Sequence, residues 1–327
     1  MKVILTGGAG FIGANLAYHW SDAYPEDELV VLDKLTYAGH RESLAPLEQA
    51  GKIRFILGDI VDPDVVDSAL RGASLVLHLA AETHVDRSLA DPAPFLTTNV
   101  LGTRTLLEGA RKHNVGRFLL VSTDEVFGSL PLDHPELRFT LTSRYDPRSP
   151  YAASKAAADH LARAYHHTYG LPVLISNCGN NYGPFQHPEK LIPLAITRLL
   201  QGKKVPLYGD GANVRDWIHV EDHARALAAI ARRGTPGETY LVGADGERSN
   251  REVLARLLAL LHREPESIEP VADRLGHDRR YAIDPSHLRE SLGWRPEVSF
   301  DEGLARTVAW YQEHRSWWEP LVRPHNG

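Results

Sequence analysis

The chain opens with a strand-like run, a glycine-rich segment and a helix, in that order. Residues 2–5 read KVIL, residues 7–13 read GGAGFIG, and apolar residues then recur at helical spacing through Trp20. A glycine-rich turn between a first strand and a first helix lets the backbone approach a pyrophosphate, whose charge the helix N-terminus favours. Glycine turns also arise for packing reasons, so the motif alone leaves a structural turn open.

The second strand supports a dinucleotide site. Residues 29–32 read LVVL and end in Asp33, twenty residues after Gly13. An acidic side chain at this point binds the ribose hydroxyls of adenosine and repels a 2′-phosphate, which favours NAD over NADP. The adjacent Lys34 argues weakly in the other direction unless it is a solvated side chain. Asp59 follows a third strand, and both an adenine contact and a helix cap are open for it.

Strands and helices continue to alternate, which predicts an α/β fold with a doubly wound parallel sheet. Further strands are expected at residues 75–79, 117–121 and 173–176. The segment 216–220 resembles a return to the main sheet, covered by a helix over 221–232. We expect an NAD-binding Rossmann domain over 1–175, with segments near 215–232 returning to it, and a smaller α/β substrate-binding lobe over 176–327. No linker-like stretch separates the two, so the second lobe should be woven onto the first.

A dense group of reactive side chains follows the strand at 117–121. Thr123, Asp124 and Glu125 come where the carboxyl end of a buried parallel strand opens into a site. Tyr151 and Lys155 are four residues apart at the start of an alanine-rich helix, and therefore lie on one helical face. A hydroxyl beside an ammonium group, with two carboxylates near, suggests proton and hydride chemistry. The alternatives are a helix cap with first-turn acids for Asp124 and Glu125, and a plain helix-start aromatic for Tyr151.

Composition narrows the class of protein. A net charge of −6 over 327 residues gives no basic surface for nucleic acid. No apolar run approaches a membrane span and no signal-peptide pattern follows Met1, so we expect a cytoplasmic chain without a membrane partner. The single Cys178 excludes an intrachain disulfide. His219 and His223 have helical spacing but no HExxH or CxxC pattern accompanies them, so no metal is expected.

Seven segments together carry a resemblance to a known family. They are TGGAGFIG, DKLTYAG, AAETHVDRS, STDEVFG, YAASK, NNYGPFQHPEKLIP and NVRDWIHVEDHARAL. The chain resembles the extended short-chain dehydrogenase/reductase family from Met1 to about Tyr311. The glycine turn and YxxxK are shared by the whole family. The Thr-Asp-Glu triplet is specific to fewer members of the family. It resembles the sequence of the nucleotide-sugar 4,6-dehydratases that act on dTDP-glucose, because epimerases of this fold usually lack the Asp-Glu pair.

The resemblance implies a role for each side chain of the group. Tyr151 would take the C4 hydroxyl proton of the sugar as a hydride leaves for NAD, while Lys155 would lower the pKa of Tyr151 and bind the nicotinamide ribose. Thr123 would hydrogen-bond the C4 oxygen. Glu125 would remove the C5 proton, and Asp124 would protonate the departing C6 hydroxyl. The hydride would then return to C6, so the cofactor ends as it began.

The glycine turn, the strand ends and the resemblance together give the expected binding residues. NAD is expected to contact Gly7, Gly10, Phe11, Ile12, Gly13, Asp33, Lys34, Leu35, Thr36, Asp59, Ile60, Leu79, Ala80, Ala81, Thr98, Tyr151, Lys155 and Asn181. The nucleotide-sugar is expected to contact Thr83, Thr123, Asn180, Lys190, Leu191, Pro206, Tyr208, Arg215, Asn250, Asp273 and His277. Arginine suits a diphosphate because its fork is bidentate, although Lys190 and Arg215 could each be surface cations.

Leu141, Gly179 and Leu275 depart from the family pattern, where an acidic residue, a serine and a proline are usual. These changes affect loop geometry and remove no group that the mechanism uses. Two other functions stay open: a UDP-sugar epimerase or dehydratase of the same fold, and a non-catalytic nucleotide-sensing module, against which a matched acid and base argue. The family also implies deoxysugar biosynthesis, as for rhamnose, and a homodimer through helices at 99–112 and 152–169, whose apolar faces could equally be core.

Overall fold

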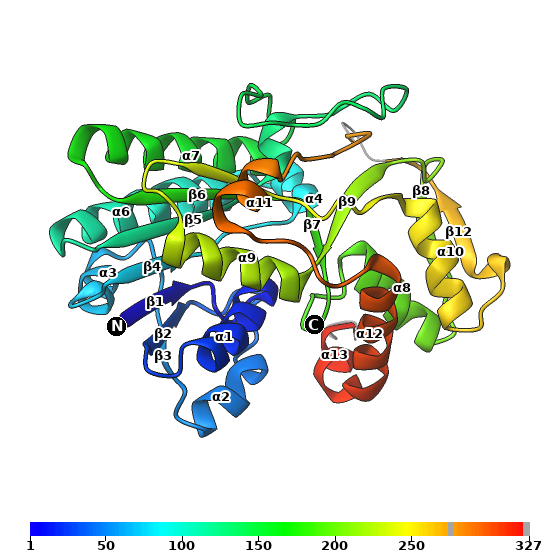
Figure 1. Cartoon of the computed structure of the whole chain (residues 1–327). Coiled ribbons are helices and arrows are strands. Elements are labelled where there is room, and N and C mark those ends of the chain that lie inside the picture. Colours follow the sequence, from blue (N-terminus) through cyan, green and yellow to red (C-terminus); the bar gives the residue numbers. More distant parts are fainter. Residues whose placement is uncertain (274–277, 323–327) are drawn as a thin grey trace.

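A seven-stranded parallel sheet forms the centre of the molecule (Figure 1). The computed structural model describes residues 1–273 and 278–322. The strands are β1 (Lys2–Thr6), β2 (Glu28–Asp33), β3 (Ile53–Leu57), β4 (Leu75–His78), β5 (Arg117–Thr123), β6 (Val173–Cys178) and β10 (Thr239–Val242). Their order is β10-β6-β5-β4-β1-β2-β3, which reverses direction between β1 and β4. The doubly wound fold is therefore confirmed, and a crevice is expected where the order reverses.

Helices cover both faces of this sheet. One face carries α1 (Phe11–Ala23), α9 (Val220–Arg233) and α11 (Ser286–Leu292), and the other carries α3 (Pro63–Leu70), α6 (Thr103–Lys112) and α7 (Pro150–Tyr169). The alternation of side chains along β1 shows why. Val3 and Leu5 pack with α1 and α9, while Ile4 packs with α3, α6 and α7. A strand buried on both faces needs the continuous apolar run that the sequence has there.

Shorter helical segments connect these layers. They are η1 (Arg41–Leu44), α2 (Ala45–Gln49), α4 (Val85–Ala90), α5 (Ala93–Phe95), η2 (Leu96–Gly102) and η3 (Asp124–Phe127). The helix η2 is a π-helix that joins α5 to α6. The segments η2 and α6 thus form one continuous helical stretch with a wider turn in its first part.

The second lobe is smaller and has its own core. Its strands are β7 (Asn180–Tyr182), β9 (Val214–His219) and β11 (Glu247–Ser249) in one sheet, and β8 (Val205–Tyr208) and β12 (Ile268–Val271) in another. Its helical segments are α8 (Leu191–Leu200), α10 (Asn250–Leu260), η4 (Pro265–Ser267), α12 (Phe300–Glu313) and α13 (Arg315–Val322). Tyr182, Trp217, Tyr311 and Trp318 fill the core between them. In Figure 1 this lobe lies to the right of the main sheet.

The expectation that residues 216–220 return to the main sheet is wrong. These residues belong largely to β9, which pairs with β7 and β11. A central strand of a parallel sheet is apolar on both faces, whereas β9 carries the buried Arg215 and Asp216. The carboxylate of Asp216 accepts from the backbone N of Gly246 at 2.7 Å, a partner that only the smaller sheet offers.

The helix that follows β9 does return to the main sheet. Helix α9 packs against α1, β5 and β6. The edge strand of the main sheet is β10, which pairs with β6 and whose Tyr240, Leu241 and Val242 are buried. The two lobes thus exchange segments along the chain. The domain division at residue 175 stays a prediction, and β6 runs past it to Cys178.

Candidate active site

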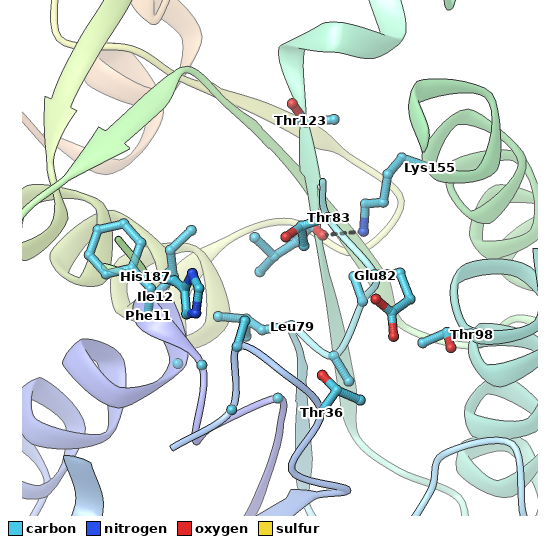
Figure 2. Close-up of a pocket in the computed structure, with 18 of the residues that line it drawn as sticks. Phe11, Ile12, Thr36, Leu79, Glu82, Thr83, Thr98, Thr123, Lys155 and His187 are labelled. Atoms are coloured by element: carbon cyan, nitrogen blue, oxygen red, sulfur yellow. Dashed lines mark hydrogen bonds between the residues drawn. The ribbon is translucent and has the colours of Figure 1, made fainter. Parts of the chain in front are cut away.

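One cleft of about 290 Å³ lies at the carboxyl ends of the main strands and is closed on its far side by residues 178–190. Every predicted catalytic residue lines it, and so does every predicted cofactor residue except Leu35. Figure 2 shows side chains from well-separated parts of the chain gathered around it, among them Phe11, Leu79, Thr98 and Lys155. The structure therefore brings the glycine turn, the strand ends and the reactive side chains together.

The glycine turn leaves no room for larger residues. A Cβ at Gly13 would lie 2.2 Å from O of Gly7, and a Cβ at Gly7 would lie 2.5 Å from N of Ala80. Gly7 also has a φ of +71°, which L side chains rarely adopt. Helix α1 begins after Gly10, whose lack of a side chain leaves the first N–H groups of the helix available to a ligand. This cradle fits the diphosphate of NAD.

Asp33 is fixed at the cleft wall by one N–H group of the glycine turn and one of its own loop. Its Oδ2 accepts from N of Ala9 at 3.0 Å, and its Oδ1 accepts from N of Leu35 at 2.8 Å. Leu35 has a φ of +56°, so it acts here through its backbone, and its side chain packs on the core of the α1 face instead of lining the cleft. The carboxylate oxygens keep further lone pairs for ribose hydroxyls.

The neighbouring Lys34 turns toward Asp59. Its Nζ lies 3.4 Å from Oδ2 of Asp59 and 3.4 Å from Oγ1 of Thr98, and all three residues line the cleft. The helix-cap alternative for Asp59 is wrong, because Asp62 caps α3 by accepting from N of Asp64 and N of Val65. Asp59 is therefore free of the capping role and stays on the cleft wall.

The turn after β5 carries two buried acids. Oγ1 of Thr123 accepts from N of Glu125 at 3.3 Å and so caps the short helix η3. The helix-cap alternative thus describes the local backbone correctly, and the same cap directs Asp124 and Glu125 into the cleft. Within residues 1–273 and 278–322, Oδ2 of Asp124 is buried without a hydrogen-bond partner.

The two acids have different electrostatic surroundings. Burial, with the charge of Glu125, raises the pKa of Asp124 well above its usual range. Burial also raises the pKa of Glu125, but the charges of Lys190 and Arg215 oppose that rise. Asp124 is therefore suited to hold a proton, and Glu125 to be ionised and take one.

Tyr151 and Lys155 lie on the face of α7 that packs against β5. The phenol of Tyr151 is buried, and burial together with the charge of Glu125 raises its pKa well above 10.0, while a hydrogen bond with Thr123 acts in the other direction. Nζ of Lys155 donates to O of Val121 at 2.8 Å. The influence that lowers the pKa of Tyr151 is thus the hydrogen bond with Thr123, and the influence of Lys155 stays a prediction.

Comparison with known proteins identifies the family. The family model for GDP-mannose 4,6 dehydratase matches residues 4–307. The chain is 53% identical to the dTDP-glucose 4,6-dehydratase of Mycolicibacterium smegmatis, over 98% of this chain and 96% of that protein. The chain belongs to the nucleotide-sugar 4,6-dehydratases of the extended short-chain dehydrogenase/reductase family. The resemblance inferred from the seven sequence segments is confirmed.

Solved structures of the family share the whole fold. A dTDP-glucose 4,6-dehydratase from Streptomyces venezuelae with NAD and TYD bound has a TM-score of 0.95 and 52% identity, and the match covers 98% of this chain and 100% of that one. The UDP-glucose 4-epimerase of Thermus thermophilus in complex with NAD has a TM-score of 0.88 and 34% identity, covering 96% of this chain and 100% of that one. The fold is thus common to dehydratases and epimerases, and site residues must separate the two activities.

The predicted substrate residues divide into two groups. Thr83, Thr123, Asn180 and Lys190 line the cleft. The others that the structure describes lie outside its lining, in the second lobe: Leu191, Pro206, Tyr208, Arg215, Asn250 and Asp273. His277 lies outside the described residues.

Arg215 lies beyond the cleft lining but is not a surface cation. Its guanidinium donates to O of Asp278 at 2.9 Å and lies 4.3 Å from the ring centre of Tyr281. Its side chain is buried, and its charge acts on the pKa of both Asp124 and Glu125. A charge of the second lobe therefore influences the pKa values of the two acids in the cleft.

Several cleft residues were missed by the sequence analysis. They are Leu32, Ala38, Gly39, Gly58, Glu82, Val121, Ser122, Cys178, Gly179, Gln186, His187 and Glu189. Glu82 follows the carboxyl end of β4, and this position alone could have predicted that it lines the cleft. Residues 186–189 lie in a polar loop whose path over the cleft no local pattern encodes.

The two histidines considered as ligands have structural roles. His219 caps α9, and Nδ1 of His223 lies 2.8 Å from Oδ1 of Asn181. In the described part of the chain, no group of three or more histidine, cysteine, aspartate or glutamate side chains could hold a metal ion. No helix among these residues has the length and apolar character needed to cross a membrane.

Proposed function

We propose that the chain is a dTDP-glucose 4,6-dehydratase, which removes water from dTDP-glucose to give dTDP-4-keto-6-deoxyglucose with NAD as its cofactor. The observation that carries this function is the Asp124-Glu125 pair beside Tyr151 in the cleft that contains the glycine cradle. Relatives that are about half identical over nearly the whole chain have this activity or bind NAD.

The chemistry explains why these groups are needed together. The C5 proton of a hexose is not acidic, but it becomes so once C4 is a ketone. NAD, held by the glycine cradle and Asp33, would supply the acceptor for the C4 hydride and the donor of the hydride to C6. The side chains of the cleft perform the proton transfers around these steps.

Tyr151 acts at C4. Its phenol takes the proton of the C4 hydroxyl as the carbonyl forms, and Thr123 holds the same oxygen by a hydrogen bond. The ammonium of Lys155 favours the phenolate and binds the nicotinamide ribose. Each role needs the helical spacing of Tyr151 and Lys155, which brings both to the inner face of α7.

Glu125 and Asp124 act at C5 and C6. Ionised Glu125 removes the C5 proton, helped by the opposing cations that limit the rise of its pKa. Asp124 keeps its proton because burial and Glu125 raise its pKa, and it donates this proton to the leaving C6 hydroxyl. A base and an acid with separated pKa values thus follow from two adjacent residues.

Cations of the second lobe suit the diphosphate of the substrate. Lys190 lines the cleft, and Arg215 lies buried behind it. We infer that both hold the diphosphate, with Thr83 and Asn180 beside the sugar.

A UDP-sugar 4-epimerase is the second candidate, because one is 34% identical to this chain with a TM-score of 0.88. Epimerisation at C4 needs neither a base for C5 nor an acid for C6. Asp124 and Glu125 therefore favour dehydration.

Incubation of the purified protein with dTDP-glucose in deuterated water, without added NADH, tests the function. We expect a 4-keto-6-deoxy product with deuterium at C5, seen by NMR and mass spectrometry. If the protein removes no water and epimerises UDP-glucose instead, the dehydratase proposal is refuted, while the fold and the family assignment are unaffected.

We also infer a homodimer built on η2, α6 and α7. Leu96 and Leu101 are 53% and 51% exposed on η2, and α6 and α7 lie side by side in Figure 1. Two large apolar side chains exposed on one helical segment favour burial against a second copy. Sedimentation velocity should give a dimer for the parent chain and a monomer for Leu101→Arg. The variant Leu260→Arg, on α10, is the control and should stay dimeric; a dimeric Leu101→Arg contradicts this interface.

A further inference from the structure

Asp159 is a buried carboxylate that the mechanism above leaves without a task. It lies on α7, four residues after Lys155 and eight after Tyr151, so the three side chains leave the same side of the helix. Its exposed fraction is 0%. A carboxylate in such a place is unfavourable unless it is hydrogen-bonded and paired with a cation. Hydrogen bonds reach one of its two oxygens, and the charge of a nearby cation acts on it.

Three side chains donate to one oxygen of Asp159. Its Oδ2 accepts from OH of Tyr145 at 2.8 Å, from Oγ of Ser122 at 3.0 Å and from Nδ2 of Asn177 at 3.1 Å. Ser122 directly precedes Thr123 on β5, while Asn177 lies on β6. Nδ2 of Asn177 also donates to O of Thr123 at 3.0 Å. The carboxylate therefore ties α7 to the ends of both strands at the point where the catalytic turn begins.

The cation is Lys155. Its side chain is buried, and Figure 2 shows it reaching from its helix toward the strand, where Nζ donates to O of Val121. Burial lowers the pKa of Lys155, and the charge of Asp159 is the largest influence that raises it. In return, burial raises the pKa of Asp159 and the charge of Lys155 lowers it. Each group thus supports the charged form of the other.

The other titratable groups around Lys155 carry no charge at neutral pH. His78, on β4, has its pKa lowered to about 3 by burial and by Lys155. Burial raises the pKa of Cys178, on β6, to about 12. Tyr151, on α7 itself, has a pKa raised well above 10.0. Asp159 is therefore the anion that faces Lys155 from the residues named here.

We propose that Asp159 is a positioning residue of the active site. Its ionised carboxylate keeps Lys155 charged, and its hydrogen bonds hold the end of β5 from which Thr123, Asp124 and Glu125 project. Asp159 is not among the described residues that line the cleft, so it acts through Lys155 and the strand end. The proposal rests on the dehydratase function, because that function gives the charge of Lys155 its purpose.

The variant Asp159→Asn tests the proposal, because it keeps the shape of the side chain and removes its charge. Lysines labelled with carbon-13 at Cε report their pKa by NMR titration, and the sequence has only eight of them. Lys155→Met assigns the signal of Lys155. We expect the pKa of Lys155 to fall by about one to three units in Asp159→Asn. We expect kcat to fall by about 10- to 100-fold with KM changed less than about twofold, since substrate contacts are untouched.

Tyr145→Phe is the matched control, because it removes one hydrogen bond and keeps the charge of Asp159. Its Lys155 pKa and its kcat should stay close to those of the parent chain. An unchanged Lys155 pKa in Asp159→Asn overturns the proposal, and so does a lowered Lys155 pKa with an unchanged kcat. The titration needs no turnover, so a parent chain without dehydratase activity would refute the proposed function and still leave the pairing of Asp159 with Lys155 measurable.

A second variant covers the case in which Asp159→Asn does not fold. The double variant Ser122→Ala with Tyr145→Phe leaves Asp159 in place with fewer donors, which raises its pKa further. Lys155 then loses its counter-charge at a higher pH than in the parent chain. A lysine stays protonated at acid pH, so the change is read on the carbon-13 signal of Lys155, which senses the titration of the neighbouring Asp159. We expect the acid inflection of that signal to move to higher pH than in the parent chain, and an inflection at the parent position contradicts the proposal.

Discussion

Asp124 and Glu125 are neighbours in the chain, yet different charges face them. Arg215 opposes the rise of both pKa values, but Lys190 opposes that of Glu125, whereas Glu125 and Asp216 raise the pKa of Asp124 further. Glu125 is therefore the base, and Glu125→Gln should lower kcat for dehydration by about 100- to 10,000-fold. Oxidation at C4 does not need this base, so reduced nicotinamide should accumulate on the variant and be seen by absorbance. A variant that still loses water at the parent rate contradicts the assignment.

The raised pKa of Asp124 also predicts how stability depends on pH. The folded chain binds this proton more tightly than the unfolded chain, whose pKa is near 3.8. The contribution of Asp124 to stability is thus full below that value and is lost as pH rises through the folded-state pKa. An asparagine at position 124 does not ionise, so it loses no stability as pH rises. We expect Asp124→Asn to gain Tm relative to the parent as pH rises above about 4, measured by calorimetry; a Tm difference that does not change with pH refutes this.

At the scale of elements, the glycine turn that joins β1 to α1 depends on close backbone approach. Gly13→Ala would bring a Cβ to 2.2 Å from O of Gly7, so the turn must open. We expect purified Gly13→Ala to lose most of its NAD, measured by absorbance after denaturation. Gly51→Ala is the control, because its Cβ would meet nothing within 4 Å. Its positive φ costs about 1 kcal/mol of stability, and its NAD content should equal that of the parent.

Some elements of the fold and the site could be predicted from the sequence, and others could not. The turn, Asp33 and the Tyr151–Lys155 spacing were predictable because each is marked by a pattern of residue types in the sequence. The π-helix η2 was not, because no residue pattern marks its wider turn; it is accompanied by long-range bonds from Nδ2 of Asn99 to O of Glu82 and to Oγ of Ser154. The sheet of β9 was mispredicted because its apolar residues suit either sheet, while the partners of its buried Arg215 and Asp216 lie far away in the sequence.

For the whole molecule, the two lobes meet over the cleft through a cluster that we call the rim cluster: Tyr37, His84, Arg87, His187 and Glu189. The guanidinium carbon of Arg87 lies 3.6 Å from the ring centre of Tyr37. Oε2 of Glu189 lies 3.6 Å from Nε of Arg87, 3.8 Å from Nε2 of His84 and 3.9 Å from Nδ1 of His187. Residues near the first strands are thereby joined to the loop after β7, which closes the cleft.

A cycle that returns its hydride requires NAD to stay bound, and the rim cluster is suited to retain it. Glu189→Ala removes the carboxylate at the centre of the cluster. We expect NAD to dissociate about tenfold faster, which corresponds to about 1.4 kcal/mol, because the lobes separate more readily. The rate can be followed by fluorescence after addition of a trap for free NAD. Glu221→Ala is the control: Glu221 pairs with Arg306 on the outer surface, away from the cleft lining, and an exposed pair of this kind contributes little. Equal release rates in the two variants would remove the rim cluster from cofactor retention and leave the glycine cradle to account for it.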